Sequence, residues 1–197
     1  MYKSVLLATL LVSASFNAAA APRTLLPAES KIEFTVKEMG VPVSGEFKRF
    51  TGDINIDSAK PEKSTASLSI EVGSLDTGSE EADAIAVDPD WLDKQHAPLA
   101  VFKSQTIRSV GGDRFESKGT LSIRNKVRDI VLQFSRVDQA GGKTVITGNF
   151  VIKRSEYGIG GGVWNKPGVV AEEIPVKVVL TLAPAAPAPA AKPAKKK

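Results

Sequence analysis

Apolar residues recur at every second position along most of the chain between Ile32 and Leu182. This alternation is typical of strands that show one face to an apolar interior and the other face to water. The chain offers little else for chemistry, since it contains one histidine and no cysteine. The pattern therefore predicts an all-β body that is held together by its core rather than by disulfides.

The alternating stretches follow one another with short connections, and glycine-rich turns separate several of them at the spacing of antiparallel hairpins. Because no strand–helix–strand rhythm is present, a doubly wound nucleotide-binding sheet is excluded, and an extended antiparallel barrel of about eight strands is predicted. Within the second strand, Gly45 and Gly52 predict bulges or tight bends. The expected strands cover residues 31–37, 43–57, 64–72, 100–110, 115–123, 128–136, 144–153 and 172–182.

The alternation stops between residues 80 and 93, where Ala82, Ile85 and Ala86 have the spacing of a short helix. The pair Asp88-Pro89 resembles a helix cap followed by proline at the first helical position. We therefore expect a helical excursion near residues 80–93, lying over one end of the barrel.

Both ends of the chain differ from the body. Residues 1–20 show a positive start, an apolar run and small residues at a cleavage zone, which predicts a signal peptide and export. The barrel domain is expected over residues 24–183. Residues 184–197 consist of alanine, proline and lysine, which predicts a disordered tail. Its lysines either touch an anionic membrane transiently or only aid solubility; they are Lys192, Lys195, Lys196 and Lys197.

The charge of the body argues against nucleic acid as a partner. The sequence pI is about 9.2. Without Lys3 and the four tail lysines, however, 21 basic side chains remain against 22 acidic ones. A nucleic-acid-binding domain needs a basic face and stacking aromatic residues, and neither is visible in the sequence.

An ordered set of short motifs resembles the YceI family and spans residues 24 to 182. The motifs are Ser30–Val36, Val43–Phe47, Phe50–Gly52, Ser74–Thr77, Pro98 with Phe102 and Ser104, Gly119–Arg124, and Arg154–Ile159.

This resemblance implies a lipocalin-like barrel in the bacterial periplasm. It also implies an apolar tunnel that holds an isoprenoid chain of quinone or polyprenyl type, as cargo for storage or transport rather than as a required cofactor. Glu38 stands where many family members carry a histidine, Ala82-Asp83-Ala84 stands near a common Arg-Asp pair, and Ala97 stands where an aromatic residue is common. These departures concern the head-group preference rather than the fold.

An isoprenoid tail is recognised by burial of hydrocarbon, at about 25 cal/mol per Å² of apolar surface. Each candidate on the apolar side of a strand either lines such a tunnel or fills it as core. Trp91 and Trp164 either contact a quinone ring or cap the barrel, and Tyr157 flanks the same glycine-rich loop. The strand candidates are Phe34, Val36, Phe47, Ile70, Val72, Phe102, Leu121, Ile123, Phe134, Phe150 and Ile152.

Catalysis and metal binding are not predicted. Gly158–Gly162 lacks the spacing of a dinucleotide fingerprint, His96 has no second histidine or cysteine beside it, and no G-x-S-x-G elbow is present. Two alternatives to a lipid carrier remain. One is a stress-response or partner-binding module with a filled barrel, and the other is an enzyme that acts on a bound lipid through Tyr157, Arg154 or His96.

Overall fold

The structure is a computed structural model that describes residues 23–184. The predicted signal peptide and the tail from residue 185 onward lie outside these residues. In chain order the elements are β1 (Arg23–Thr24), η1 (Pro27–Glu29), β2 (Lys31–Glu38), β3 (Val41–Phe47), β4 (Phe50–Asn55), η2 (Pro61–Lys63), β5 (Thr65–Glu71), η3 (Val72–Ser74), β6 (Leu75–Asp76), α1 (Glu80–Ala86), β7 (Leu99–Gly111), β8 (Arg114–Ile123), β9 (Lys126–Asp138), η4 (Ala140–Gly142), β10 (Thr144–Lys153), α2 (Arg154–Tyr157), η5 (Gly162–Asn165) and β11 (Glu173–Leu182).

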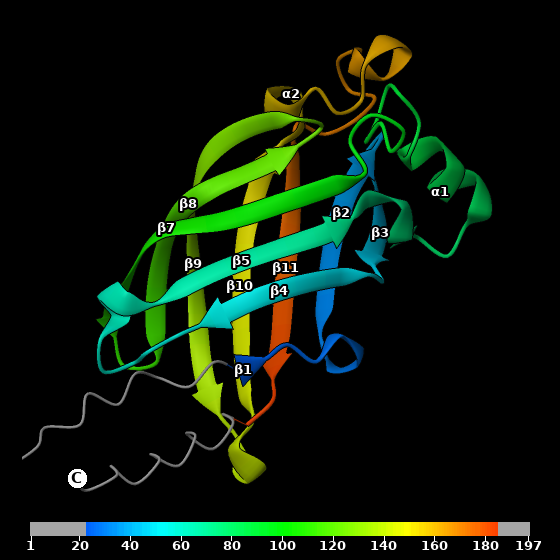
Figure 1. Cartoon of the computed structure of the whole chain (residues 1–197). Helices are drawn as coiled ribbons and strands as arrows, with labels where there is room; N and C mark the ends of the chain where they lie inside the picture. The colour runs from blue at the N-terminus through cyan, green and yellow to red at the C-terminus, as the bar shows by residue number, and fades with distance from the viewer. Residues whose placement is uncertain (1–22, 185–197) are drawn as a thin grey trace, which may run out of the picture.

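The described strands form one antiparallel sheet in the order β1-β4-β5-β7-β8-β9-β10-β11-β2-β3-β6. Strands β3 and β4 are consecutive parts of one bent strand, and β5 and β6 are consecutive parts of another. Because β4 pairs with β5 and β3 pairs with β6, the sheet returns on itself. Figure 1 shows the resulting curled wall, with β4 and β5 crossing in front of β10 and β11. The all-β antiparallel barrel class is confirmed.

The number of strand segments differs from the prediction of about eight, because the structure divides one predicted strand into β3 and β4 and adds the short strands β1 and β6. The predicted strand 43–57 is interrupted at Lys48 and Arg49. There the amide of Lys48 donates to the carbonyl of Ser74 (3.0 Å), and the amide of Glu71 donates to the carbonyl of Arg49 (3.0 Å). The two breaks therefore lie side by side, and the chain bends there without leaving the wall.

The prediction of bulges at Gly45 and Gly52 is wrong, since both glycines pair in regular register. They instead make room for cross-strand side chains. A Cβ atom on Gly45 would lie 2.6 Å from Cζ of Phe34, and one on Gly52 would lie 3.0 Å from Cδ1 of Leu68. The register shifts lie elsewhere, between β7 and β8, at Ser104/Thr106 and Ser109/Gly111.

One end of the barrel is closed by packing. Leu25 bridges to Leu182, and the amide of Leu26 donates to the carbonyl of Thr181 (2.8 Å), so the segment at β1 spans from β4 to β11. Phe115 and Phe134 stack at this end, with ring centroids 5.5 Å apart and planes 17° apart. We call this the closed end.

A helical lid covers the opposite end, where Figure 1 shows α1 beside the upper part of β2 and β3. The helix begins after Ser79, whose side chain accepts a hydrogen bond from the amide of Ala82. The predicted excursion is therefore present, but the predicted cap at Asp88-Pro89 is wrong. Asp88 instead begins a turn in which its carbonyl accepts from the amides of Trp91 and Asp93. Ser79 is the better helix start because Glu80 and Glu81 in the first turn complement the helix dipole.

The turn after α1 is tied to the barrel from two sides. Arg124 and Asn125, at the β8–β9 hairpin, donate to the carbonyls of Pro89 (2.6 Å) and His96 (3.0 Å). The amide of Gly161, in the loop before β11, donates to the carbonyl of Asp90 (2.8 Å). These bonds hold the lid over the barrel end.

Candidate functional site

The interior of the barrel contains two apolar cavities. The larger, about 190 Å³, lies under α1 and is called the upper chamber. The smaller, about 120 Å³, extends toward the closed end and is called the lower chamber. Both chambers are walled in part by Ile32, Ile70, Leu121 and Phe150, so they adjoin along the barrel and meet at these four side chains.

Most of the residues predicted as tunnel candidates lie in the walls of these chambers. This follows from the period-two alternation, because it places every second side chain of a strand on the inside of the wall. The upper chamber is lined by Phe34, Val36, Phe47, Ile70, Val72, Trp91, Leu121, Ile123, Phe150, Ile152 and Trp164. The lower chamber is lined by Ile70, Phe102, Leu121, Phe134 and Phe150.

Sequence reasoning missed further wall residues, and those that lie on strands carry the same alternation signal. Ile174, Val176, Val178 and Leu180 form the inner face of β11 but were not among the candidates. The other missed apolar residues are Ile32, Val43, Leu75, Ala82, Ile85, Ala86, Leu92, Ala100 and Ile159 in the upper chamber, and Ile32, Ile54, Ile56, Ala66, Leu68, Ile107, Ile130, Leu132 and Ile146 in the lower chamber.

Tyr157 lies outside both chambers. It belongs to α2, is 1 % exposed, and borders a groove between β9 and β10. These two strands pair only from Asp138/Thr144 to Gln133/Asn149 and then separate, with α2 following β10 at the wider end. Burial raises the pKa of the Tyr157 phenol. Its position makes Tyr157 part of the wall rather than of the chamber lining.

The two tryptophans contact each other at the lid end. Trp91 is 6 % exposed, and its ring meets that of Trp164 edge to face, with centroids 5.4 Å apart and planes at 67°. Both rings also belong to the upper chamber. They therefore cap the barrel and line its cavity at once, two roles that sequence analysis treated as alternatives.

Arg154 has a structural position under the glycine-rich loop. Its buried guanidinium donates from Nη1 to the carbonyls of Ile159 and Gly160, each at 3.0 Å. Gly158 and Gly160 have φ values of 71° and 73°, the left-handed region that glycine adopts without strain. The loop is thus tightly bent around a cation, which holds Trp164 near Trp91.

The walls of the chambers contain few polar groups. In the upper chamber these belong to Glu38, Thr77 and the indole of Trp91, and in the lower chamber to Ser67, Ser117 and Asn149. Nε1 of Trp91 and Oγ of Ser117 are buried and have no hydrogen-bond partner among residues 23–184.

His96 lies on the surface, where Nδ1 and Oδ1 of Asp93 are 2.8 Å apart. A hydrogen bond to His96 lowers the pKa of the Asp93 carboxyl. Among residues 23–184, no group of three or more His, Cys, Asp or Glu side chains is placed to hold a metal ion. Within the same residues, no helix has both the length and the apolar character needed to cross a membrane.

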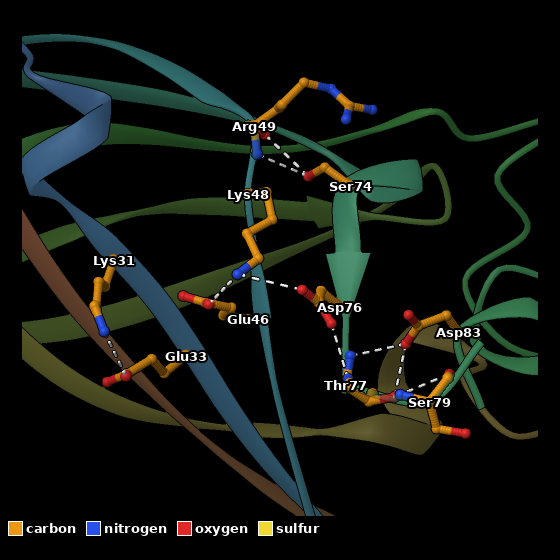
Figure 2. Close-up of polar contacts among 11 residues, drawn as sticks. Lys31, Glu33, Glu46, Lys48, Arg49, Ser74, Asp76, Thr77, Ser79 and Asp83 are labelled. Carbon is orange, nitrogen blue, oxygen red and sulfur yellow. Dashed lines mark hydrogen bonds and ion pairs between the residues drawn. The ribbon is translucent and has the colours of Figure 1, made fainter. Parts of the chain in front are cut away.

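A polar cluster lies where β3 meets β6. Figure 2 shows Lys48 between Glu46, which it contacts closely, and Asp76, at 3.2 Å. The hydrogen bond from the amide of Gly78 (2.8 Å) and the contact with Lys48 lower the pKa of the Asp76 carboxyl. Bonds to Glu46 and Asp76 raise the pKa of Lys48. The cluster fastens the last strand pair that closes the wall.

The fold and the site together define a class: a small antiparallel barrel with an apolar, chambered interior under a helical lid. A comparison with known protein families supports this class, because the model of the YceI-like domain matches residues 24–182 of this chain. The chain belongs to the YceI-like family.

Sequence relatives carry the name UPF0312 protein. The protein from Azotobacter vinelandii is 27 % identical over 134 residues, which cover 65 % of this chain and 70 % of that protein. A Vibrio cholerae protein is 28 % identical over 106 residues, which cover 53 % of this chain and 56 % of that protein.

Solved structures show the same fold. BcnA of Burkholderia cenocepacia has 31 % identity and a TM-score of 0.77, covering 80 % of this chain and 98 % of that one. A polyisoprenoid binding domain from Saccharophagus degradans, implicated in plant cell wall breakdown, has 18 % identity and a TM-score of 0.66. That match covers 84 % of this chain and 99 % of that domain, and it concerns the fold alone.

Proposed function

We propose that this protein binds the isoprenoid chain of a quinone- or polyprenyl-type lipid in its two chambers, for storage or transport. The observation that carries the proposal is the pair of adjoining apolar chambers that meet at Ile32, Ile70, Leu121 and Phe150. A linear hydrocarbon chain matches such a cavity, because its affinity comes from apolar surface removed from water, at about 25 cal/mol per Å². The name of the Saccharophagus degradans domain, polyisoprenoid binding, supports this cargo by analogy of fold.

The proposal needs no catalytic step. The side chains that an enzyme would use are engaged elsewhere: Arg154 bonds to loop carbonyls, His96 pairs with Asp93 on the surface, and Tyr157 lies outside the chambers. Incubation of the protein with a prenol, followed by mass spectrometry, is expected to return the prenol unchanged. A product of altered mass would show that the protein acts as an enzyme rather than as a carrier.

The proposed site of action is the periplasm, from the family resemblance and the export signal predicted for residues 1–20. Cell fractionation followed by N-terminal sequencing is expected to find the protein in the periplasm with Ala21 as its first residue. Recovery of the intact chain from the cytoplasm would contradict this.

The direct test of the cargo is mass spectrometry of organic extracts from protein purified from its periplasm without detergent. A stoichiometric isoprenoid or quinone is expected. If the extract is empty, and stays empty after incubation with quinone-loaded vesicles, the barrel is a filled core and the partner-binding module takes the place of the carrier.

We also propose that Lys192, Lys195, Lys196 and Lys197 contact anionic membranes during lipid exchange, each contributing about 1 kcal/mol near the surface. Deletion of residues 184–197 is expected to weaken association with anionic vesicles at low salt and to leave affinity for the lipid unchanged. Equal vesicle association with and without the tail would contradict a role of these lysines in membrane contact.

A further inference from the structure

The upper chamber contains a buried hydrogen-bond donor at the lid end. Nε1 of Trp91 has no acceptor among residues 23–184, although its ring is 6 % exposed and belongs to the chamber wall. The other uncharged polar side chain in the wall of this chamber is Thr77, and its hydroxyl already donates a hydrogen bond to Asp83 (2.7 Å). A buried donor without an acceptor is costly, so the indole N–H favours a ligand that places an acceptor oxygen beside it.

The same chamber contains one charged side chain, and it is negative. Glu38 ends β2 beside the lid and belongs to the wall. No ion pair joins it to a basic side chain among the described residues, and no lysine, arginine or histidine belongs to that wall. A carboxylate in a weakly polar cavity repels a phosphate or carboxylate head group and accepts a hydrogen bond from a donor.

These two groups set conditions that few head groups meet. A phosphate or carboxylate accepts from Trp91 but is repelled by Glu38, whereas an ammonium is attracted by Glu38 but offers no acceptor to Trp91. A hydroxyl meets both conditions, because it is uncharged and both accepts and donates hydrogen bonds.

We propose that the upper chamber selects isoprenoids with an uncharged hydroxyl head, as in a prenyl alcohol or a hydroquinone, and holds that head at Trp91 and Glu38. This rests on the proposed function, since it names the ligand class for the same cavity. It also fixes the orientation of the cargo, with its head under the lid and its tail in the lower chamber.

The lower chamber provides the internal control. The hydroxyl of Ser117, which is 2 % exposed, is also buried without a partner among residues 23–184. A ligand bound in the reverse orientation would place its head there. Ser117→Ala therefore tests the orientation and Trp91→Phe tests the head contact, while Glu38→Gln tests the charge, with the exposed Glu81→Gln on α1 as its matched control.

The experiment measures the affinities of delipidated full-length protein for three C15 probes: farnesol, farnesyl monophosphate and farnesylamine. Farnesol is expected to bind at least tenfold more tightly than the other two. Trp91→Phe is expected to weaken farnesol binding about three- to tenfold, the range of one hydrogen bond. Glu38→Gln is expected to strengthen phosphate binding, whereas Glu81→Gln leaves all three affinities unchanged. Ser117→Ala is expected to keep the preference for farnesol over the other two probes.

Each contrary outcome has its own meaning. If none of the three probes binds, the proposed function fails together with this inference. If the monophosphate binds as tightly as farnesol, or if Trp91→Phe changes nothing, lipid binding stands and the head-group assignment is overturned. If Ser117→Ala weakens farnesol binding and Trp91→Phe does not, the cargo lies in the reverse orientation. The thermal unfolding midpoint of each variant separates these effects from loss of folding.

Discussion

Trp91 and Trp164, 73 positions apart in the sequence, meet edge to face with their ring centroids 5.4 Å apart. They are the two tryptophans of the chain, so the fluorescence of this protein reports on the lid end of its cavity. The contact joins the turn after α1 to the loop before β11.

Trp164→Leu is expected to expose the indole of Trp91 to solvent. The single remaining emission spectrum then shifts to the red, and the free energy of unfolding falls by about 1 kcal/mol, the value typical of an aromatic pair. Fluorescence and urea titration measure both effects. An unshifted spectrum would mean that Trp91 is covered by something other than Trp164.

Leu121→Trp is expected to shorten the cavity, because Leu121 belongs to both chambers. An octaprenyl chain should lose its binding, whereas a geranyl chain should still enter the upper chamber. Overpacking should lower stability by about 1–3 kcal/mol. Isothermal titration with the two chain lengths measures the effect, and Val127→Trp, on the exposed outer face of β9, is the control. Equal loss of both chain lengths would contradict a two-chamber tunnel.

Gly119→Ala is expected to destabilise the barrel by about 1–3 kcal/mol. A Cβ atom at this position would lie 2.3 Å from the carbonyl oxygen of Lys103, beside the register shift between β7 and β8. Gly148→Ala is the matched control in another strand, since its nearest atoms lie at 3.4 Å. Chemical denaturation of the two variants compares them, and equal stabilities would contradict the close approach at Gly119.

Arg154→Lys is expected to loosen the glycine-rich loop, because an ammonium cannot reproduce the paired bonds to the carbonyls of Ile159 and Gly160. The loss should be about 1.5–3 kcal/mol, as for a hydrogen bond to a charged group. The exposed neighbour Lys153→Gln should stay within about 0.5 kcal/mol of the parent. If both variants unfold at the same midpoint, Arg154 does not organise the loop.

Stability is expected to fall with acidification through the Asp76 carboxyl. Its pKa is lowered in the folded protein, so its contribution is present at neutral pH and is lost as the pH falls below about 4, where the carboxyl becomes protonated. Asp76→Asn should reduce this part of the acid sensitivity. Thermal unfolding at pH 6 and pH 3 measures it, and the same midpoint shift in parent and variant would assign the sensitivity to other groups.

The chamber walls could be predicted from sequence because alternation in a strand fixes which side chains face inward, as for Phe34 and Ile70. The bend at Lys48 and Arg49 could not, since no glycine or proline marks it and it depends on hydrogen bonds to Glu71 and Ser74 far along the chain.

The lid shows the same limit. The helix over one end was predicted near residues 80–93, but the cap was predicted at Asp88-Pro89, whereas the observed cap is Ser79. Tyr157 was expected near the cavity mouth, but the turn of α2 places it beside the groove between β9 and β10, outside both chambers. Contacts such as Trp91 with Trp164 depend on topology, which spacing alone does not encode.

The separation of β9 from β10 beyond Gln133 and Asn149 has a mechanical consequence for the barrel. In the part of the wall described, each strand there keeps its partner on the far side, β8 for β9 and β11 for β10. Widening the bore along this seam therefore breaks no ladder hydrogen bond and disturbs mainly the side chains around α2. The wall can therefore widen at the lid end while the strand pairs near the closed end stay intact.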